Sequence, residues 1–250
     1  MGRAALGAVF QRWRQWDWIA AQRVDAYVAN SQTTKRRVAR YFGREATVLH
    51  PPVEVERFTP TGPGDAYVVL SELMPYKRID VAVRAFNELR LPLVVVGNGP
   101  DARRLHRMAG PTVTFTGRVS DAEAAGMLAR ARALVVPATE EFGIAAVEAQ
   151  AAGRPVIALC EGGVRETVIE GETGAFFERP EPADLVEVVR RFDALAIDPD
   201  VCVANARRFD TAHFRRGLRA VVELALDGLG SRRAARRRPP RRARGLARPV

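Results

Sequence analysis

From residue 67 onward the sequence alternates short apolar runs with longer amphipathic stretches, and this alternation constrains the fold more than any other feature. Strands that alternate with helices are typical of a parallel sheet covered by helices. The apolar runs predict strands at residues 67–70, 93–96, 113–115, 134–136, 156–159 and 174–177. The other stretches predict helices at residues 79–89, 100–108, 121–132, 143–152, 166–170 and 182–194. The predicted fold is an α/β, Rossmann-like doubly wound parallel sheet that binds its ligand at the carboxyl ends of the strands.

The first 50 residues follow a different pattern. Apolar residues recur there at three- and four-residue spacing, which predicts an amphipathic helix. They are Leu6, Val9, Phe10, Trp13, Trp16 and Ala20. A strand at 26–29, a helix at 33–41 and a strand at 47–49 are expected to follow. The Trp-rich face fits a membrane surface or, as the favoured interpretation, packing against protein.

The composition predicts a packed core, because 47% of the 250 residues are hydrophobic. No stretch approaches the ~20 uninterrupted apolar residues of a membrane-spanning helix, and the N-terminus lacks the apolar region of a signal peptide. Cys160 and Cys202 show neither metal-ligand spacing nor a disulfide framework. These features predict a cytoplasmic location, with peripheral contact at the inner face of the membrane left open.

The positive charge is concentrated at the C-terminal end. The net charge is +10 and residues 231–250 hold nine Arg and no acid, which leaves +1 for the rest of the chain. A run rich in Arg, Ala, Pro and Gly buries little apolar surface, so these residues are predicted to be a disordered tail. Such a tail is able to contact anionic lipid or RNA. Because Lys occurs only at positions 35 and 77, a general bias toward Arg is the favoured explanation, and nucleic-acid binding is not expected.

Two carboxylates flank a predicted helix start in the middle of the chain. Glu140 lies in the loop before the helix and Glu148 lies inside it. A helix N-terminus offers unpaired N–H groups and a partial positive charge, so phosphate oxygens are expected near Phe142, Gly143 and Ile144. An isolated pair of this kind is more often a solvated helix residue and an acid near an N-cap. Here the surrounding motifs favour a binding site.

This segment resembles the Glu-(seven residues)-Glu motif of the retaining group-one glycosyltransferases of GT-B fold, also called family four. The likeness covers roughly residues 13–215 through further motifs in the family's order. These are Val28-Ala-Asn-Ser31, Arg44-Glu-Ala-Thr-Val-Leu-His-Pro-Pro-Val53, Pro75-Tyr-Lys-Arg78, Val96-Gly-Asn-Gly-Pro100, Phe115-Thr-Gly-Arg-Val119, Gly162-Gly163 and Gly171-Glu-Thr-Gly174.

The Pro-Tyr-Lys-Arg variant looks like that of bacterial mannosyltransferases of polysaccharide assembly. The resemblance implies transfer of a hexosyl group, with GDP-mannose the first expectation for the donor, to a glycan or lipid-linked acceptor. It also implies retention of configuration and no metal or other cofactor.

The resemblance divides the chain into five parts. Residues 1–50 are the remnant of a second α/β domain, the acceptor-side N-terminal domain, and residues 51–60 are the interdomain connection. Residues 61–210 are the nucleotide-sugar-binding domain, residues 211–230 are a closing helix and residues 231–250 are the tail. The earlier part of the N-terminal domain is not in this sequence, so a separate polypeptide that supplies it, or self-association, is expected.

The resemblance also assigns roles to single residues. Glycosyl transfer needs cations and N–H groups against the charge that develops on the leaving diphosphate. Lys77, with Arg78 beside it, is expected to bind that diphosphate. Glu140 is expected to bind hydroxyls of the donor sugar and Glu148 those of the ribose, because carboxylates accept hydrogen bonds from paired hydroxyls. Lys77 and Glu140 are the expected catalytic residues. Gly117, Arg118 and Val119 are expected beside the base, although Arg118 alone also fits a surface residue.

One position departs from the family pattern. The family usually has Arg five residues before the Lys, whereas this chain has Glu72. A carboxylate in a poorly solvated cleft repels a diphosphate by up to a few kcal/mol. Either Glu72 turns away and another Arg compensates, or activity is impaired. In the second case the chain is a non-catalytic nucleotide-sugar-binding subunit or a degenerate fragment.

Two other motifs have weaker interpretations. The segment from Gly97 to Ala102 matches a dinucleotide-binding fingerprint, but no acidic residue follows the next strand to bind a ribose, so NADP-dependent oxidation is disfavoured. Asp198-Pro-Asp200 is better explained as a helix cap than as a metal motif. No cluster of metal ligands is visible in the sequence.

Overall fold

A six-stranded parallel sheet forms the main body of this computed structural model, which describes residues 2–237 and the side chains of residues 6–228. The strand order is β5-β4-β3-β6-β7-β8. The strands are β3 (Tyr67–Leu70), β4 (Leu93–Val96), β5 (Val113–Gly117), β6 (Leu134–Val136), β7 (Val156–Leu159) and β8 (Gly174–Phe177). The Rossmann-like α/β prediction is confirmed, and β5 is the one strand whose predicted bounds differ, since it continues to Gly117.

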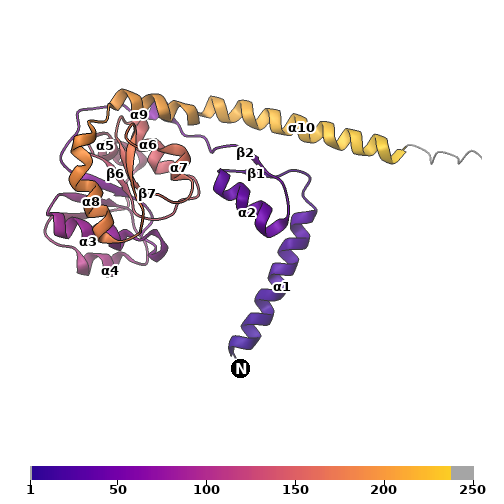
Figure 1. The fold of residues 1–250 in the computed structure, drawn as a ribbon, viewed down its shortest axis with the longest axis horizontal. Helices are drawn as coiled ribbons and strands as arrows, with labels where there is room; N and C mark the ends of the chain where they lie inside the picture. The colour runs from indigo at the N-terminus through magenta and orange to yellow at the C-terminus, as the bar shows by residue number, and fades with distance from the viewer. Residues whose placement is uncertain (1, 238–250) are drawn as a thin grey trace, which may run out of the picture.

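Helices cover both faces of this sheet (Figure 1). They are α3 (Ile79–Leu89), α4 (Ala102–Met108), α5 (Asp121–Ala129), α6 (Ile144–Ala151), α7 (Val164–Thr167), α8 (Pro182–Phe192) and α9 (Pro199–Ala206). Alternate strand residues enter two different cores: Tyr67 and Val69 pack with α3, α4 and α8, whereas Val68 packs with α5, α6 and α9. Burial on both faces explains why the strands appear in the sequence as continuous apolar runs.

Helices α4, α6 and α8 differ from the predicted ranges by one or two residues at an end, and three other helical segments differ more. Helix α5 ends at Ala129, because the chain must already turn into the sheet, where the Arg132 N–H donates to the Ala66 carbonyl at 2.8 Å. Helix α7 begins after Gly163 and ends before the extended residue Val168. Helix α9 was not predicted as an element, but the predicted cap is confirmed, since the Asp198 carboxylate accepts from the N–H of Asp200 at 2.9 Å.

Short 3-10 helices complete the connections. They are η1 (Val55–Arg57), η2 (Pro75–Lys77), η3 (Asp193–Leu195) and η4 (Arg207–Phe209). The first ends at Arg57 and the second at Lys77, and both residues line the candidate site.

The N-terminal residues form a separate small unit. It contains α1 (Gly2–Gln22), β1 (Val28–Ala29), α2 (Gln32–Phe42) and β2 (Thr47–Val48), and the two strands pair in parallel. Ser31 caps α2 by accepting from the N–H of Thr34, and Gly43 ends the helix in the left-handed conformation. The expected strand, helix and strand are present, although each strand has only two residues.

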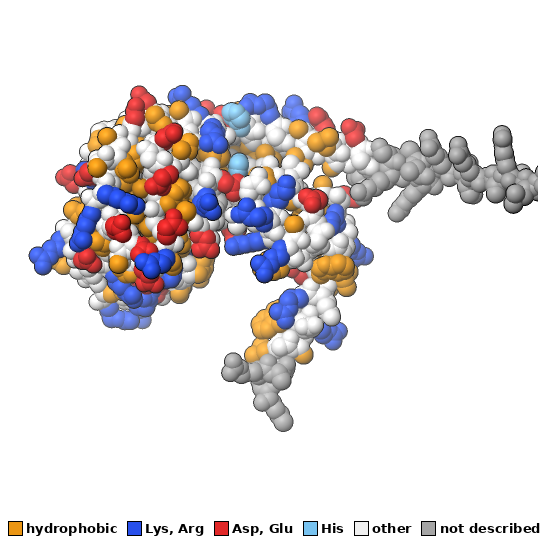
Figure 2. All heavy atoms as spheres, viewed as in Figure 1, with side chains coloured by type: hydrophobic (Ala, Val, Ile, Leu, Met, Phe, Trp, Pro, Cys, Tyr) orange, Lys and Arg blue, Asp and Glu red, His pale blue; other side chains and the backbone are white. Residues whose placement is uncertain are grey.

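Helix α1 projects away from the rest of the molecule (Figure 1). Its large apolar side chains are exposed, with Trp13 at 63% and Trp16 at 71%, and they are visible as an orange group in Figure 2. Across the described helices, none has both the length and the apolar character needed to cross a membrane.

The C-terminal helix α10 (Thr211–Arg237) is longer than predicted. The expected closing helix at 211–230 lies within it, and it continues past the predicted start of the tail at 231. Residues 231–237 belong to this helix, and Ala and Arg are strong helix formers that suit its extension. The remainder of the predicted tail, residues 238–250, lies outside the described residues.

Candidate functional site

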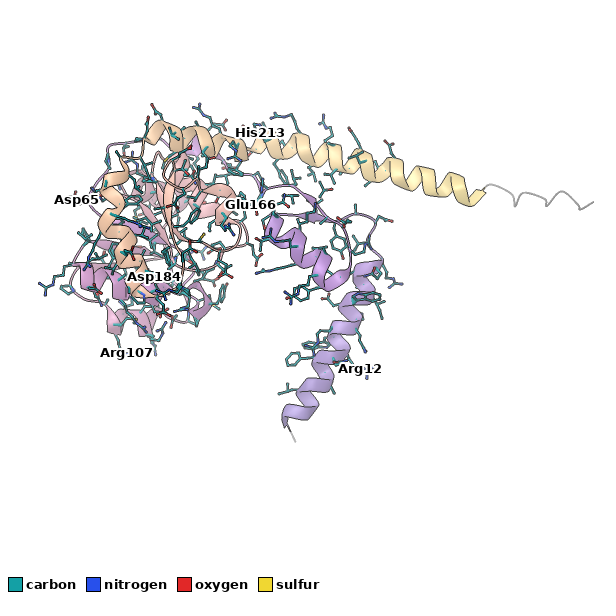
Figure 3. The ribbon with its side chains drawn as sticks, in the orientation of Figure 1. Arg12, Asp65, Arg107, Glu166, Asp184 and His213 are labelled. Atoms are coloured by element: carbon teal, nitrogen blue, oxygen red, sulfur yellow. The ribbon has the colours of Figure 1, made fainter. Side chains whose placement is uncertain are left out.

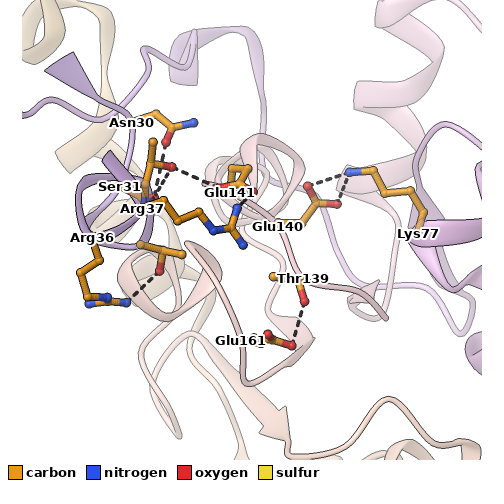
Figure 4. A network of polar contacts seen from close by, with 11 residues as sticks. Asn30, Ser31, Arg36, Arg37, Lys77, Thr139, Glu140, Glu141 and Glu161 are labelled. Atoms are coloured by element: carbon orange, nitrogen blue, oxygen red, sulfur yellow. Dashed lines mark hydrogen bonds and ion pairs between the residues drawn. The ribbon is translucent and has the colours of Figure 1, made fainter. Parts of the chain in front are cut away.

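Two charged residues meet where the strand order of the sheet reverses. Strand β3 lies between β4 and β6, so the loops after β3 and β6 diverge at the carboxyl edge and leave a crevice, which is where open α/β sheets bind ligands. Lys77 follows β3 and Glu140 follows β6. The Lys77 Nζ lies 2.6 Å from Glu140 Oε1 and 2.8 Å from Oε2, and both side chains are largely buried (Figure 4). The structure thus brings together the two residues expected to be catalytic.

The loop of Glu140 is fixed by the Gly162-Gly163 pair. The Gly163 N–H donates to the Glu140 carbonyl at 2.6 Å, and Gly162 pairs with Glu140 in an isolated β-bridge. A Cβ at Gly162 would lie 2.2 Å from the Glu140 carbonyl oxygen, and a Cβ at Gly163 would lie 2.2 Å from that of Glu141. Two residues without side chains are therefore needed for the loop to come this close.

Helix α6 begins directly after this loop. Gly143 adopts φ 88°, a left-handed conformation that favours glycine, and the first residues of α6, whose N–H groups lack partners within the helix, line the crevice. Phe142 is buried next to this turn, with 3% of its surface exposed. The centroid of its ring lies 5.5 Å from that of His50 and 5.4 Å from that of Phe209. Ile144 is 49% exposed at the mouth.

The crevice is a cleft of ≈ 410 Å³, which we call the switch-point cleft. Its lining includes Glu72, Lys77, Glu140, Phe142, Gly143 and Ile144. A Lys ammonium and helix N–H groups converge there, and this combination suits a phosphate or diphosphate.

A second cleft of ≈ 620 Å³ lies next to the first, and we call it the Glu148 cleft. Its lining includes Arg57, Glu72, Gly97, Asn98, Arg118, Val119, Asp121 and Glu148. Burial is the largest influence on Glu148 and raises its pKa, the Arg57 guanidinium lowers this pKa, and Asp121 raises it. Ser71 and Glu72 line both clefts, so a ligand that contains a diphosphate and a ribose would pass these two residues.

The remaining predicted site residues divide into two groups. Arg118 and Val119 line the Glu148 cleft, and Gly117 precedes them at the end of β5 with φ 72°. The structure does not bring Arg78 to either cleft. Its guanidinium donates to the Pro180 carbonyl at 3.1 Å and lies 3.5 Å from Asp80, because the left-handed backbone of Arg78 turns the side chain away from Lys77.

Glu72 is exposed and belongs to the lining of both clefts. Arg57 and Asp121, which also line the Glu148 cleft, were not singled out from the sequence. Arg57 lies in the predicted interdomain connection and Asp121 at a helix start, and neither position carries a motif for binding.

The small N-terminal unit contacts the same loops. The Glu166 carboxylate accepts from the Gln32 N–H at 2.9 Å and lies 3.0 Å from His50 Nε2. Glu166 faces α2 in Figure 3. Glu141 accepts from Thr34 Oγ1 at 3.1 Å and pairs with Arg37 (Figure 4). Helix α2 thus contacts the Glu140 loop through Glu141 and helix α7 through Glu166.

Within the described part of the chain, no three or more His, Cys, Asp and Glu side chains gather closely enough to hold a metal ion. The charged groups at the two clefts are the Lys, Arg, Asp and Glu side chains named above.

Residues 59–209 match the family described as glycosyl transferases group 1, and the chain belongs to this family. The match spans the six-stranded sheet and most residues that line the two clefts, whereas Arg57 lies just before it.

Curated relatives and solved structures agree with this family. The chain is 32% identical over 219 residues to a D-inositol 3-phosphate glycosyltransferase of Streptomyces avermitilis, covering 73% of this chain and 47% of the relative. It is 33% identical over 221 residues to a GDP-mannose-dependent alpha-(1-6)-phosphatidylinositol monomannoside mannosyltransferase of Mycobacterium tuberculosis, covering 74% of this chain and 57% of the relative. The crystal structure of Anabaena HepE in complex with UDP and glucose superposes with a TM-score of 0.73 at 20% identity, over 82% of this chain and 64% of that one. The chain therefore spans about half the length of the curated relatives it matches.

Proposed function

We propose that this chain binds the donor in a glycosyltransferase reaction that moves a mannosyl group from GDP-mannose to a glycan or lipid-linked acceptor. The observation that carries the proposal is the Lys77–Glu140 pair at the switch point, beside the start of α6. These groups supply the cation, the N–H donors and the carboxylate that a sugar diphosphate requires.

The ion pair also suggests how the donor is received. A diphosphate carries more negative charge than one carboxylate, so it competes with Glu140 for the Lys77 ammonium. Release from Lys77 frees both Glu140 oxygens to accept hydrogen bonds from hydroxyls of the sugar. The Lys77 ammonium and the N–H groups of α6 then stabilise the charge that develops on the leaving diphosphate.

The donor and the stereochemistry are the finer parts of the proposal. GDP-mannose dependence is stated for the mycobacterial relative, whereas HepE was crystallised with UDP and glucose. Retention of configuration and catalysis without a metal ion follow the family resemblance. The cation and the helix N–H groups in the switch-point cleft are chemically able to neutralise the leaving diphosphate without a metal.

Titration calorimetry with GDP-mannose, UDP-glucose and ADP-glucose tests donor binding. We expect GDP-mannose to bind most tightly. Transfer of labelled mannose to a lipid extract, with NMR of the anomeric proton and with a chelator added, tests retention and metal independence. Absence of binding by all three nucleotide sugars at millimolar concentration would refute the proposal.

A second candidate function is a non-catalytic nucleotide-sugar-binding subunit. The observation that favours it is Glu72, a carboxylate that lines both clefts where the family usually has Arg. If the wild-type chain and the Glu72→Arg variant both bind GDP-mannose but transfer no mannose, this candidate is supported over the enzyme.

A further inference from the structure

Arg57 connects the two helices that border the Glu148 cleft. Its Nη2 lies 3.2 Å from Glu148 Oε1 on α6, and its Nη1 lies 3.6 Å from Asp121 Oδ2 at the start of α5. The guanidinium also lies over the ring of Phe58, 5.0 Å from its centroid. One side chain thus joins two carboxylates and an aromatic face at the edge of the cleft.

The backbone that carries Arg57 is held in place independently of these contacts. Phe58 is 7% exposed in the core beneath α6, and the N–H of Val53 donates to the Phe209 carbonyl at 2.9 Å. The Arg57 N–H donates to the Glu54 carbonyl at 3.0 Å and closes η1. The guanidinium therefore projects from an anchored segment toward a carboxylate that is itself mostly buried, since the Glu148 side chain is 19% exposed.

The charges around Glu148 act in opposite directions. Burial and Asp121 raise the pKa of Glu148, and Arg57 lowers it. Arg118 and Glu72 line the same cleft but form no ion pair with Glu148 among the described side chains. Arg57 is thus the positive group that contacts this carboxylate. A protonated carboxyl is a poorer partner for a pair of hydroxyls, because one oxygen has become a donor.

We propose that Arg57 is a positioning residue for Glu148, which it holds as an ionised acceptor for the ribose hydroxyls of a nucleotide in the Glu148 cleft. The contact uses Oε1, so Oε2 is the oxygen proposed to accept from the ribose. The inference rests on the proposed function, because it needs a nucleotide sugar in the two clefts. It adds a residue from the segment before the sheet to a site otherwise built from the loops of the sheet.

The test is the affinity for GDP-mannose as a function of pH. Both phosphates of this probe are esterified and keep a constant charge over the range in which carboxyls titrate, so changes come from the protein. Binding needs ionised Glu148, so affinity is present above its pKa and is lost as the pH falls through it. Arg57→Gln removes the group that lowers this pKa and should move the loss of affinity to higher pH. Asp121→Asn removes a group that raises it and should move the loss to lower pH.

At a pH on the acid side of the wild-type midpoint, Arg57→Gln should bind roughly tenfold more weakly for each unit by which the midpoint moves. Arg57→Lys should restore much of the wild-type profile because it keeps the charge. An effect of Arg57 on folding alone would leave the midpoint unchanged. Asp121 is 88% exposed, so its variant is expected to fold and keeps the test decisive if Arg57→Gln is unstable.

The outcomes separate the two proposals. If the wild type does not bind GDP-mannose, both are overturned. If the wild type binds and Glu148→Gln weakens binding, but the profiles of Arg57→Gln and Asp121→Asn match that of the wild type, donor binding stands and the role of Arg57 is wrong. Shifts in opposite directions for the two variants support it.

Discussion

Replacing Gly163 with Ala is expected to displace the loop that carries Glu140. The new Cβ would lie 2.2 Å from the Glu141 carbonyl oxygen and 2.5 Å from the Phe142 Cα, whereas ordinary contact begins at 3.4 Å. Both are backbone atoms of the loop and cannot rotate away as a side chain can. The loop must therefore move by about 1 Å to avoid overlap with the new methyl group. The change therefore reaches the site as well as the fold.

The magnitude follows from overpacking. Such substitutions typically cost about 1–3 kcal/mol of unfolding free energy, which for a chain of this size lowers the Tm by roughly 2–12 °C. A displacement of about 1 Å in a positioned group can also cost up to about 100-fold in function. We expect the affinity for GDP-mannose to fall at least roughly tenfold, with a smaller loss for GDP, because GDP lacks the sugar that Glu140 is proposed to bind.

Gly126→Ala is the matched control. The same methyl group there meets only the end of the Arg130 side chain at 3.5 Å, and the position lies inside α5. Ala is the better helix former, so a gain of about 0.5–1 kcal/mol is expected. Differential scanning fluorimetry and calorimetric titration measure both variants. If Gly163→Ala keeps the wild-type Tm and the wild-type ratio of the affinities for GDP-mannose and GDP, the claim that Gly163 fixes the Glu140 loop is refuted.

Three further variants address the charges and the exposed helix. Glu140→Gln should weaken the binding of GDP-mannose by about 1–3 kcal/mol in calorimetry, the scale of a charge-assisted hydrogen bond. An equal loss in the binding of GDP would contradict the role of Glu140 in binding the sugar. Glu72→Arg should tighten GDP binding and make it more sensitive to salt, since a repulsive charge becomes attractive, and unchanged affinity at low salt would show that Glu72 does not face the ligand. Replacing Trp13 and Trp16 by Gln should reduce self-association in sedimentation velocity, because exposed apolar patches favour association. A monodisperse wild type would contradict this last expectation.

The body of the fold was predictable from the sequence because its strands are fully buried. Such strands appear as uninterrupted apolar runs with abrupt ends, as in 134–136 and 156–159, and their bounds are those of β6 and β7. Helix ends were less predictable. The C-terminal end of α5 is set by the connection into the sheet, which depends on a contact with Ala66 that is distant in the sequence.

The part of the candidate site that lies on loops after strands was predictable from the sequence. The topology alone brings Lys77 and Glu140 to the same edge, and the structure pairs them. Side-chain direction was not predictable. The neighbours Lys77 and Arg78 look equivalent in the sequence, but the left-handed backbone of Arg78 sends its guanidinium to Pro180. The contact of Arg57 with Glu148 joins residues 91 positions apart, and no local pattern indicates it.

The central claim, that a nucleoside diphosphate binds at the switch point against Lys77, is tested most directly by titrating GDP into the wild type, Lys77→Met and Arg78→Met. The two variants remove neighbouring positive charges, of which one lines the cleft and the other does not. We expect the wild type to bind, Lys77→Met to lose roughly tenfold or more in affinity, and Arg78→Met to bind like the wild type. No binding by the wild type, or equal losses in the two variants, would contradict the claim.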